Sequence, residues 1–113
     1  MNEATRASVR ARAGDRCEYR RLHQDDSPLA ALHVEHIIAR KHGGSDDPEN
    51  LALACIDCNL RKGPNLTGID PLTAQVCELF HPRRHRWDEH FEWNGVHVVG
   101  KTATGRTTIR FWT

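Results

Sequence analysis

The stretch of sequence that decides the fold is His33-Val34-Glu35-His36-Ile37-Ile38, followed by Asn50 and by Cys55-Ile56-Asp57-Cys58-Asn59-Leu60-Arg61-Lys62. It opens on a carboxylate beside a histidine. A Gly-Gly pair and an Asn-Leu pair come next, and a Cys-x-x-Cys turn then leads into an asparagine and two basic residues. Carboxylate, imidazole and amide groups bind divalent ions and move protons. Their order along the chain indicates a metal-dependent site on a small strand–strand–helix unit.

The first strand of this unit is predicted over residues 31–38, where apolar and polar residues alternate. A period of two places His33 and Glu35 on one face of a straight strand. The same period turns His36 to the opposite face.

The second strand is predicted over the apolar residues 51–54, and a helix then begins near Asp57 and ends at Gly63-Pro64. Gly43-Gly44 allows a turn with positive φ in the loop between the strands. Residues 24–30 predict a polar loop before the first strand.

A helix is predicted over residues 2–13, because alanines favour it and Gly14 is a natural stop. Two interpretations of this helix stand side by side. It is either an ordinary solvated helix or a helix that contacts phosphate groups through its arginines, Arg6, Arg10, Arg12 and Arg16.

Beyond residue 64 the pattern predicts a helix over 72–80, whose apolar stripe packs into the core: Leu72, Val76, Leu79 and Phe80. Residues 88–93 and 96–99 predict two strands joined at Asn94-Gly95. Residues 105–112 predict a last strand, whose open edge we expect to pair with a partner.

The chain has 113 residues and a formal charge of +1, which predicts one domain over 1–113 and no strongly basic surface overall. No apolar run is long enough to span a bilayer, and the first residues show no hydrophobic signal region. We therefore expect a cytoplasmic protein without a membrane partner. In that compartment a Cys-x-x-Cys pair indicates metal binding more than a disulfide.

The ordered motif resembles the HNH endonuclease family, in its HNN variant and as a small standalone protein. The resemblance covers a core of about residues 15–63, with residues 64–113 as a C-terminal extension. It implies an α+β fold with a ββα-metal core, the HNH or His-Me finger. An N-terminal helix, a C-terminal helix and a β-hairpin would flank that core.

The resemblance also implies the roles of the site residues. His36 would be the general base, reaching the groove because the chain curls there, and Asn50 would tie down the loop and orient it. Glu35 and Asn59 match the ligands of one catalytic ion, and oxygen ligands favour Mg²⁺ or Mn²⁺. His33 is either a further ligand or phosphate contact, or an ordinary strand histidine.

A second metal site, a structural Zn²⁺ site, is implied by the family's cysteines. Three candidate ligands are present, Cys17, Cys55 and Cys58, but Arg20 stands where relatives have another cysteine. His23 is the candidate fourth ligand, since structural zinc takes four. The alternative is that zinc is lost or weakly held and that Cys17 packs as a small buried hydrophobe.

Two groups of basic residues are candidates for contact with a nucleic-acid backbone. Arg61 and Lys62 follow Asn59 on the predicted helix. The densest basic cluster precedes Trp87, and an aromatic neighbour suits such contacts; it comprises Arg83, Arg84 and Arg86. The alternative for this cluster is an ordinary solvated surface with no binding role.

The sequence therefore predicts an endonuclease that hydrolyses phosphodiester bonds in DNA, with a histidine base and one divalent ion. RNA as a substrate and the oligomeric state stay open. The main alternative is a non-catalytic nucleic-acid-binding metal module derived from such a nuclease. A second alternative is a toxin-like nuclease or a partner-dependent subunit.

Overall fold

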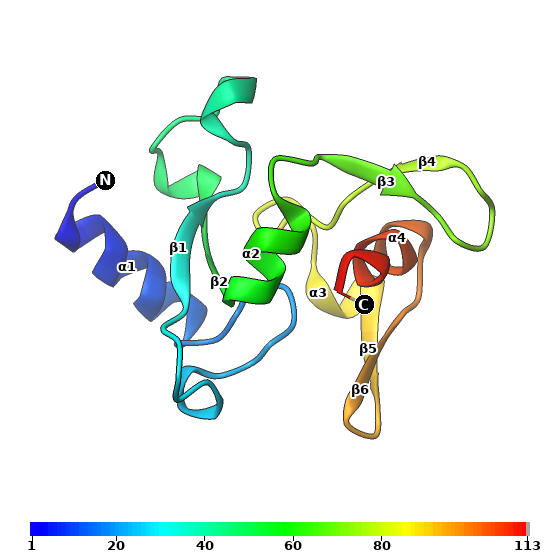
Figure 1. Ribbon diagram of the computed structural model, residues 1–113, viewed down its shortest axis with the longest axis horizontal. Helices are drawn as coiled ribbons and strands as arrows, with labels where there is room; N and C mark the ends of the chain where they lie inside the picture. Colours follow the sequence, from blue (N-terminus) through cyan, green and yellow to red (C-terminus); the bar gives the residue numbers. More distant parts are fainter. Residues whose placement is uncertain (113) are drawn as a thin grey trace. The chain divides into compact units, whose positions relative to one another are not determined.

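The computed structural model describes residues 1–112, which form a mixed α+β chain (Figure 1). In chain order its elements are α1 Glu3–Ala13, the 3-10 turn η1 Gln24–Asp26, β1 His33–His36, η2 Arg40–His42, η3 Pro48–Asn50, β2 Leu51–Ala54, α2 Ile56–Lys62, β3 Thr67–Ile69, β4 Val76–Glu78, α3 Trp87–His90, β5 Phe91–Asn94, β6 His97–Gly100 and α4 Ala103–Trp112. The predicted α+β class is confirmed. Two compact units divide the chain, Met1–Leu60 and the part from Arg61 onward.

The first unit is built around the antiparallel pair of β1 and β2. Glu35 faces Ala52 and His36 faces Leu51 across this ladder. All four residues of β2 have no exposed surface, whereas β1 is partly exposed along its length. The pair therefore has a fully buried strand that anchors it and a neighbouring strand that presents polar side chains.

Helix α1 covers this pair and is fixed by both of its ends. The Asn2 side chain accepts a hydrogen bond from the Thr5 N–H, and Gly14 takes the left-handed conformation that ends the helix. Arg10 donates to the Leu32 carbonyl and Arg12 to the Leu51 carbonyl, each at 2.7 Å. Arg10 and Arg12 therefore make contacts within the first unit, and the two interpretations of the helix stay predictions.

The second unit contains two hairpins, β3–β4 and β5–β6, and helix α4, which packs against β3, β4 and β6. Aromatic rings form its core. The Phe80 and Phe91 ring centroids are 5.1 Å apart, and Phe91 stacks on Trp112 at 5.4 Å. The predicted hairpin near Asn94-Gly95 is confirmed, with Gly95 at φ 64° in the turn. A short helix, α3, replaces the first part of the predicted strand 88–93.

The helix predicted over residues 72–80 is wrong. The Asp70 side chain accepts hydrogen bonds from the Leu72 N–H and the Thr73 hydroxyl, which hold the chain in a turn. Ala74 then adopts φ 62°, outside the range of a right-handed helix. Strand β4 follows, paired with β3, and leaves Leu72 and Val76 at 74% and 70% exposure.

The last strand, predicted over residues 105–112, is wrong as well, because this segment is helix α4. Threonines favour strands in isolation, but here they satisfy tertiary contacts. The Thr108 hydroxyl donates to the Thr104 carbonyl and accepts from the Phe80 N–H. The Gly105 N–H donates to the Thr102 hydroxyl at the start of the helix. No strand edge is left there to pair with a partner.

A buried ion pair joins α4 to the turn before β4. Asp70 has no exposed surface, and Arg106 donates to both of its carboxylate oxygens, at 3.0 and 2.8 Å. The hydrogen bonds from Arg106, helped by those from Leu72 and Thr73, hold the pKa of Asp70 well below its usual range.

Among residues 1–112, none of the helices has both the length and the apolar character needed to cross a bilayer.

The turn and strand observed over residues 70–80 predict that the same substitution, leucine to alanine, has different effects at two positions. Leu79→Ala should lower the free energy of unfolding by about 2–5 kcal/mol, because it empties a buried position. Leu72→Ala should change it by no more than about 0.5 kcal/mol, because Leu72 is exposed. Urea unfolding of both variants measures the two free energies. Equally large losses in both would contradict the turn and support the predicted helix.

The ion pair predicts an acid dependence of stability. The folded-state pKa of Asp70 is depressed, so its contribution is present above the unfolded pKa and is lost as pH falls through the folded value. The free energy of unfolding should therefore decrease from about pH 5 downward. Asp70→Asn should flatten part of this slope, as followed by urea unfolding at several pH values. An unchanged slope would contradict the assigned role of the pair.

Candidate functional site

Glu35 and His36 lie at the end of β1, where the ladder with β2 fixes the backbone. The Glu35 carboxylate lies beside the Tyr19 hydroxyl, which is fully buried. Burial, followed by the charge of Glu35, raises the pKa of Tyr19 well above its usual range. Tyr19 therefore stays protonated and can donate to the carboxylate. No sequence pattern predicts this contact, because tyrosine is an ordinary core residue.

The imidazole of His36 is held by a loop carboxylate. Its Nε2 lies 2.7 Å from Oδ1 of Asp46. The guanidinium of Arg40 donates to both oxygens of the same carboxylate, at 2.8 and 3.0 Å, and the amino group of Met1 lies 3.4 Å from Oδ2. The hydrogen bond to His36 and the charge of Arg40 lower the pKa of Asp46. Asp46 is not among the site residues that the sequence predicts.

Asn50 ties the loop that joins β1 to β2. Its Oδ1 accepts from the Ile38 N–H at 2.9 Å, and its Nδ2 donates to the carbonyls of Ile38 and Ser45 at 3.0 and 2.8 Å. Gly44 passes so close to this point that a Cβ there would lie 1.7 Å from the Ile38 carbonyl oxygen. Only glycine fits, while Gly43 supplies the expected positive φ of 86°.

Asn59 lies in the first turns of α2, where its N–H donates to the Cys55 carbonyl. Its pairing with Glu35 at one ion stays a prediction. His33 is exposed on β1. In the part of the chain that the structure describes, one group of at least three His, Cys, Asp or Glu residues has its ligand atoms within 4.8 Å of one another. His33 and Glu35 do not belong to this group.

That set consists of the sulfur atoms of Cys17, Cys55 and Cys58, all of them buried. The sequence separates Cys17 from the other two by nearly forty positions, and β2 brings them together: the Glu18 N–H donates to the Leu53 carbonyl at 2.8 Å. Hydrogen bonds from Cys17, then from Cys58, lower the pKa of the Cys55 thiol. Three adjacent sulfurs are a donor set that fits zinc.

The chain makes a tight turn after Cys17, and Arg20 lies in this turn. The Arg20 N–H points at the Cys17 sulfur at 3.5 Å, and the Arg21 N–H donates to the Cys17 carbonyl at 2.9 Å. Arg21 takes a φ of 65°. The side chain of Arg20 lies near Asp57, at 3.7 Å, and its charge also favours the Cys55 thiolate.

His23 is not brought to this cluster. Its Nδ1 accepts a hydrogen bond from the Asp25 N–H at 3.0 Å, which starts η1. The described residues therefore supply three of the four ligands that a structural zinc ion takes.

The candidate nucleic-acid contacts differ in their exposure. Arg61 is exposed at the end of α2, whereas Lys62 is 8% exposed. Arg84 donates to Glu78 at 2.9 Å, and Arg86 is exposed before α3. Arg83 is half-buried. Three of the five side chains are therefore exposed, those of Arg61, Arg84 and Arg86.

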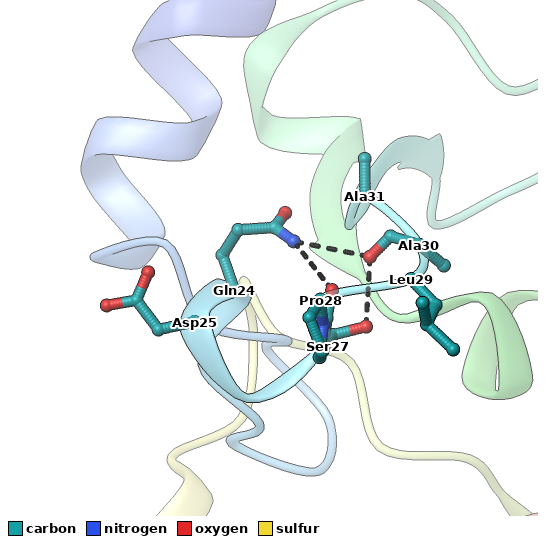
Figure 2. A pocket seen from close by; sticks show the side chains of 7 residues that line it. All are labelled: Gln24, Asp25, Ser27, Pro28, Leu29, Ala30 and Ala31. Carbon is teal, nitrogen blue, oxygen red and sulfur yellow. Dashed lines mark hydrogen bonds between the residues drawn. The ribbon is translucent and has the colours of Figure 1, made fainter.

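A shallow hollow lies over η1 and the loop after it (Figure 2). Gln24 crosses it and donates to the Ser27 and Ala30 carbonyls, while its oxygen accepts from the Leu32 N–H. Its polar groups are thus used to shape the loop. Its lining comprises Gln24, Asp25, Ser27, Pro28, Leu29, Ala30 and Ala31.

Comparison with known families gives a match over slightly less than half of the chain. The family described as HNH endonuclease matches residues 15–65, which contain β1, β2, α2 and the three clustered cysteines. The match over these residues supports an HNH endonuclease family protein, and members of that family are usually nucleases. The predicted family is therefore confirmed. No curated protein and no solved structure matches the chain.

The cysteine cluster predicts that one substitution completes a zinc site. Arg20→Cys should raise the affinity for Zn²⁺ about tenfold or more, equal to about 1.4 kcal/mol, because a fourth thiolate replaces a cation beside the cluster. Competition with a chromophoric chelator measures the affinity. Arg21→Cys is the matched control, since it adds the same thiol one residue away. Equal gains in both variants would contradict the assignment of position 20.

Proposed function

We propose that this protein is a metal-dependent HNH endonuclease that hydrolyses phosphodiester bonds in DNA, with His36 as the general base. The observation that carries the proposal is the geometry within the matched residues. Glu35 and His36 end a strand whose following loop is tied back by Asn50. This arrangement places a carboxylate and a histidine at consecutive positions of one paired strand, beside a loop that the Asn50 side chain fixes.

His36 would remove the proton from the attacking water. A histidine suits this role because its ordinary pKa lies near neutral pH. Asn50 would act indirectly, by fixing the loop through hydrogen bonds to both backbone groups of Ile38. The imidazole would then not need to reorient when the substrate arrives, which lowers the barrier by positioning.

Glu35 and Asn59 would hold the catalytic ion, with Tyr19 supporting the Glu35 carboxylate. Carboxylate and amide oxygens fit Mg²⁺ or Mn²⁺. When bound, that ion would supply charge neutralisation at the phosphoryl group and at the leaving 3′ oxygen. The Asn59 amide corresponds to the HNN variant and is a weaker ligand for softer ions than imidazole.

The ββα-metal core belongs to the same proposal. β1, β2 and α2 would form it, and the three cysteines beside α2 would hold a structural Zn²⁺ with a fourth ligand from outside the sulfur set. Arg61 and Arg86 would contact the DNA backbone, because they are exposed and cationic.

The second candidate function is a nucleic-acid-binding metal module without catalysis. The specific observation in its favour is Arg20, which leaves the cysteine set one ligand short. Such a module would keep the basic residues and bind DNA but would cleave nothing. The effect of removing His36 separates the two candidates.

A plasmid assay tests the proposal. Supercoiled DNA is incubated with the protein in EDTA, Mg²⁺, Mn²⁺ or Zn²⁺. We expect nicking or cleavage in Mg²⁺ or Mn²⁺ and none in EDTA. His36→Ala should reduce the rate by about 10²–10⁴-fold, because the general base is lost.

The matched control is His97→Ala, an exposed histidine on β6. It should cleave like the wild type. A wild type that binds DNA but cleaves it in no metal would favour the binding module, and full activity of His36→Ala would remove His36 from the mechanism.

A further inference from the structure

A carboxylate that the motif does not include lies against the proposed base. Oδ1 of Asp46 is 2.7 Å from Nε2 of His36, a short distance that is typical of a charge-assisted hydrogen bond. Asp46 is ten residues away in the sequence, in the loop before η3, and is not part of the strand that carries the base. The contact therefore depends on how the loop is held.

Further contacts hold the carboxylate and its loop in this place, among them the Met1 amino group, 3.4 Å from Oδ2. Arg40 donates to both of its oxygens from η2. Asn50 donates to the carbonyl of Ser45, the residue before Asp46, at 2.8 Å. The side chain that anchors the loop thus also fixes the residue beside the carboxylate. Arg40 in addition offsets the negative charge, so that the pair does not repel an approaching phosphate.

The contact determines which ring nitrogen of His36 carries the hydrogen. An ionised carboxylate accepts hydrogen bonds and donates none, so Nε2 is the N–H of the pair. In a neutral imidazole the other nitrogen, Nδ1, is then the acceptor. Among residues 1–112, no hydrogen bond to Nδ1 is found. Its lone pair is therefore not used in a hydrogen bond within the described residues.

We propose that Asp46 is a positioning residue for the His36 base: by accepting the Nε2–H, it holds the imidazole in the tautomer whose Nδ1 takes the proton from the attacking water. This inference rests on the proposed nuclease function. It assigns to Asp46 no contact with the substrate or the ion, and it names Nδ1 as the atom that receives the proton.

The first test is kinetic and uses a fluorogenic oligonucleotide duplex in Mg²⁺ or Mn²⁺. Asp46→Ala should lower kcat about 10–100-fold with KM changed by less than about twofold, because the base is misoriented while the binding groups remain. Asp46→Asn keeps an acceptor oxygen and should retain more of the activity than Asp46→Ala. Adding Asp46→Ala to His36→Ala should cause no further loss, because the two residues act as a unit.

Asp47→Asn is the matched control. Asp47 lies on the same loop and carries the same charge, but it caps η3 by accepting the Glu49 N–H at 2.9 Å, which asparagine can also do. It should leave kcat unchanged. Asp46→Ala with wild-type activity would overturn the inference, and so would a faster enzyme, because Asp46 would then restrain the base.

The second test reads the tautomer directly and does not depend on cleavage. Nitrogen-15 NMR of labelled histidines should show hydrogen on Nε2 of His36 in the wild type, and a loss of this preference in Asp46→Ala. A purely structural role would not move the tautomer. If the wild type cleaves no DNA, the proposed function fails, and this spectrum alone decides the role of Asp46. Hydrogen on Nδ1 in the wild type would overturn it.

Discussion

The first unit depends on the side chain of Asn50, whose amide pairs with both backbone groups of Ile38 as a neighbouring strand would. Buried or half-buried backbone groups need partners, and the chain leaves the ladder at this point. A single amide therefore replaces the missing strand. The Asn50 amide closes the loop and leaves no space for a side chain at Gly44. It also holds the segment that carries the Asp46 carboxylate beside His36.

The strand pair, α2 and the terminal helix α1 were predictable from the sequence because local signals agreed with the tertiary structure. Leu51–Ala54 is apolar and buried, and Gly14 ends α1 as expected. The part from Arg61 onward was not predictable in the same way. The apolar spacing of residues 72–80 suits a helix, yet Asp70 caps a turn there because Arg106 holds it from a distant helix. A hydrogen bond across 36 residues leaves no trace in local periodicity.

The candidate site likewise has one part that the sequence predicts and one part that it does not. The identities of Glu35, His36 and Asn50 follow from an ordered motif, and so does the meeting of Cys55 with Cys58. The contact of Asp46 with His36 does not follow, because it arises from the path of an exposed loop. The same holds for Tyr19 beside Glu35. Sequence therefore indicates the candidate residue types, while the side chains that contact them become visible only in three dimensions.

Helix α4 has a consequence for how the second part of the chain folds. Its threonines have low helix propensity, and Thr108 is held by the Phe80 N–H, 28 residues away. Excised as a peptide, residues 103–112 should be unstructured, since so short a segment cannot propagate a helix by itself. The helix and the turn at Asp70 must then form together, so this region folds at a rate set by long-range encounters rather than by local nucleation.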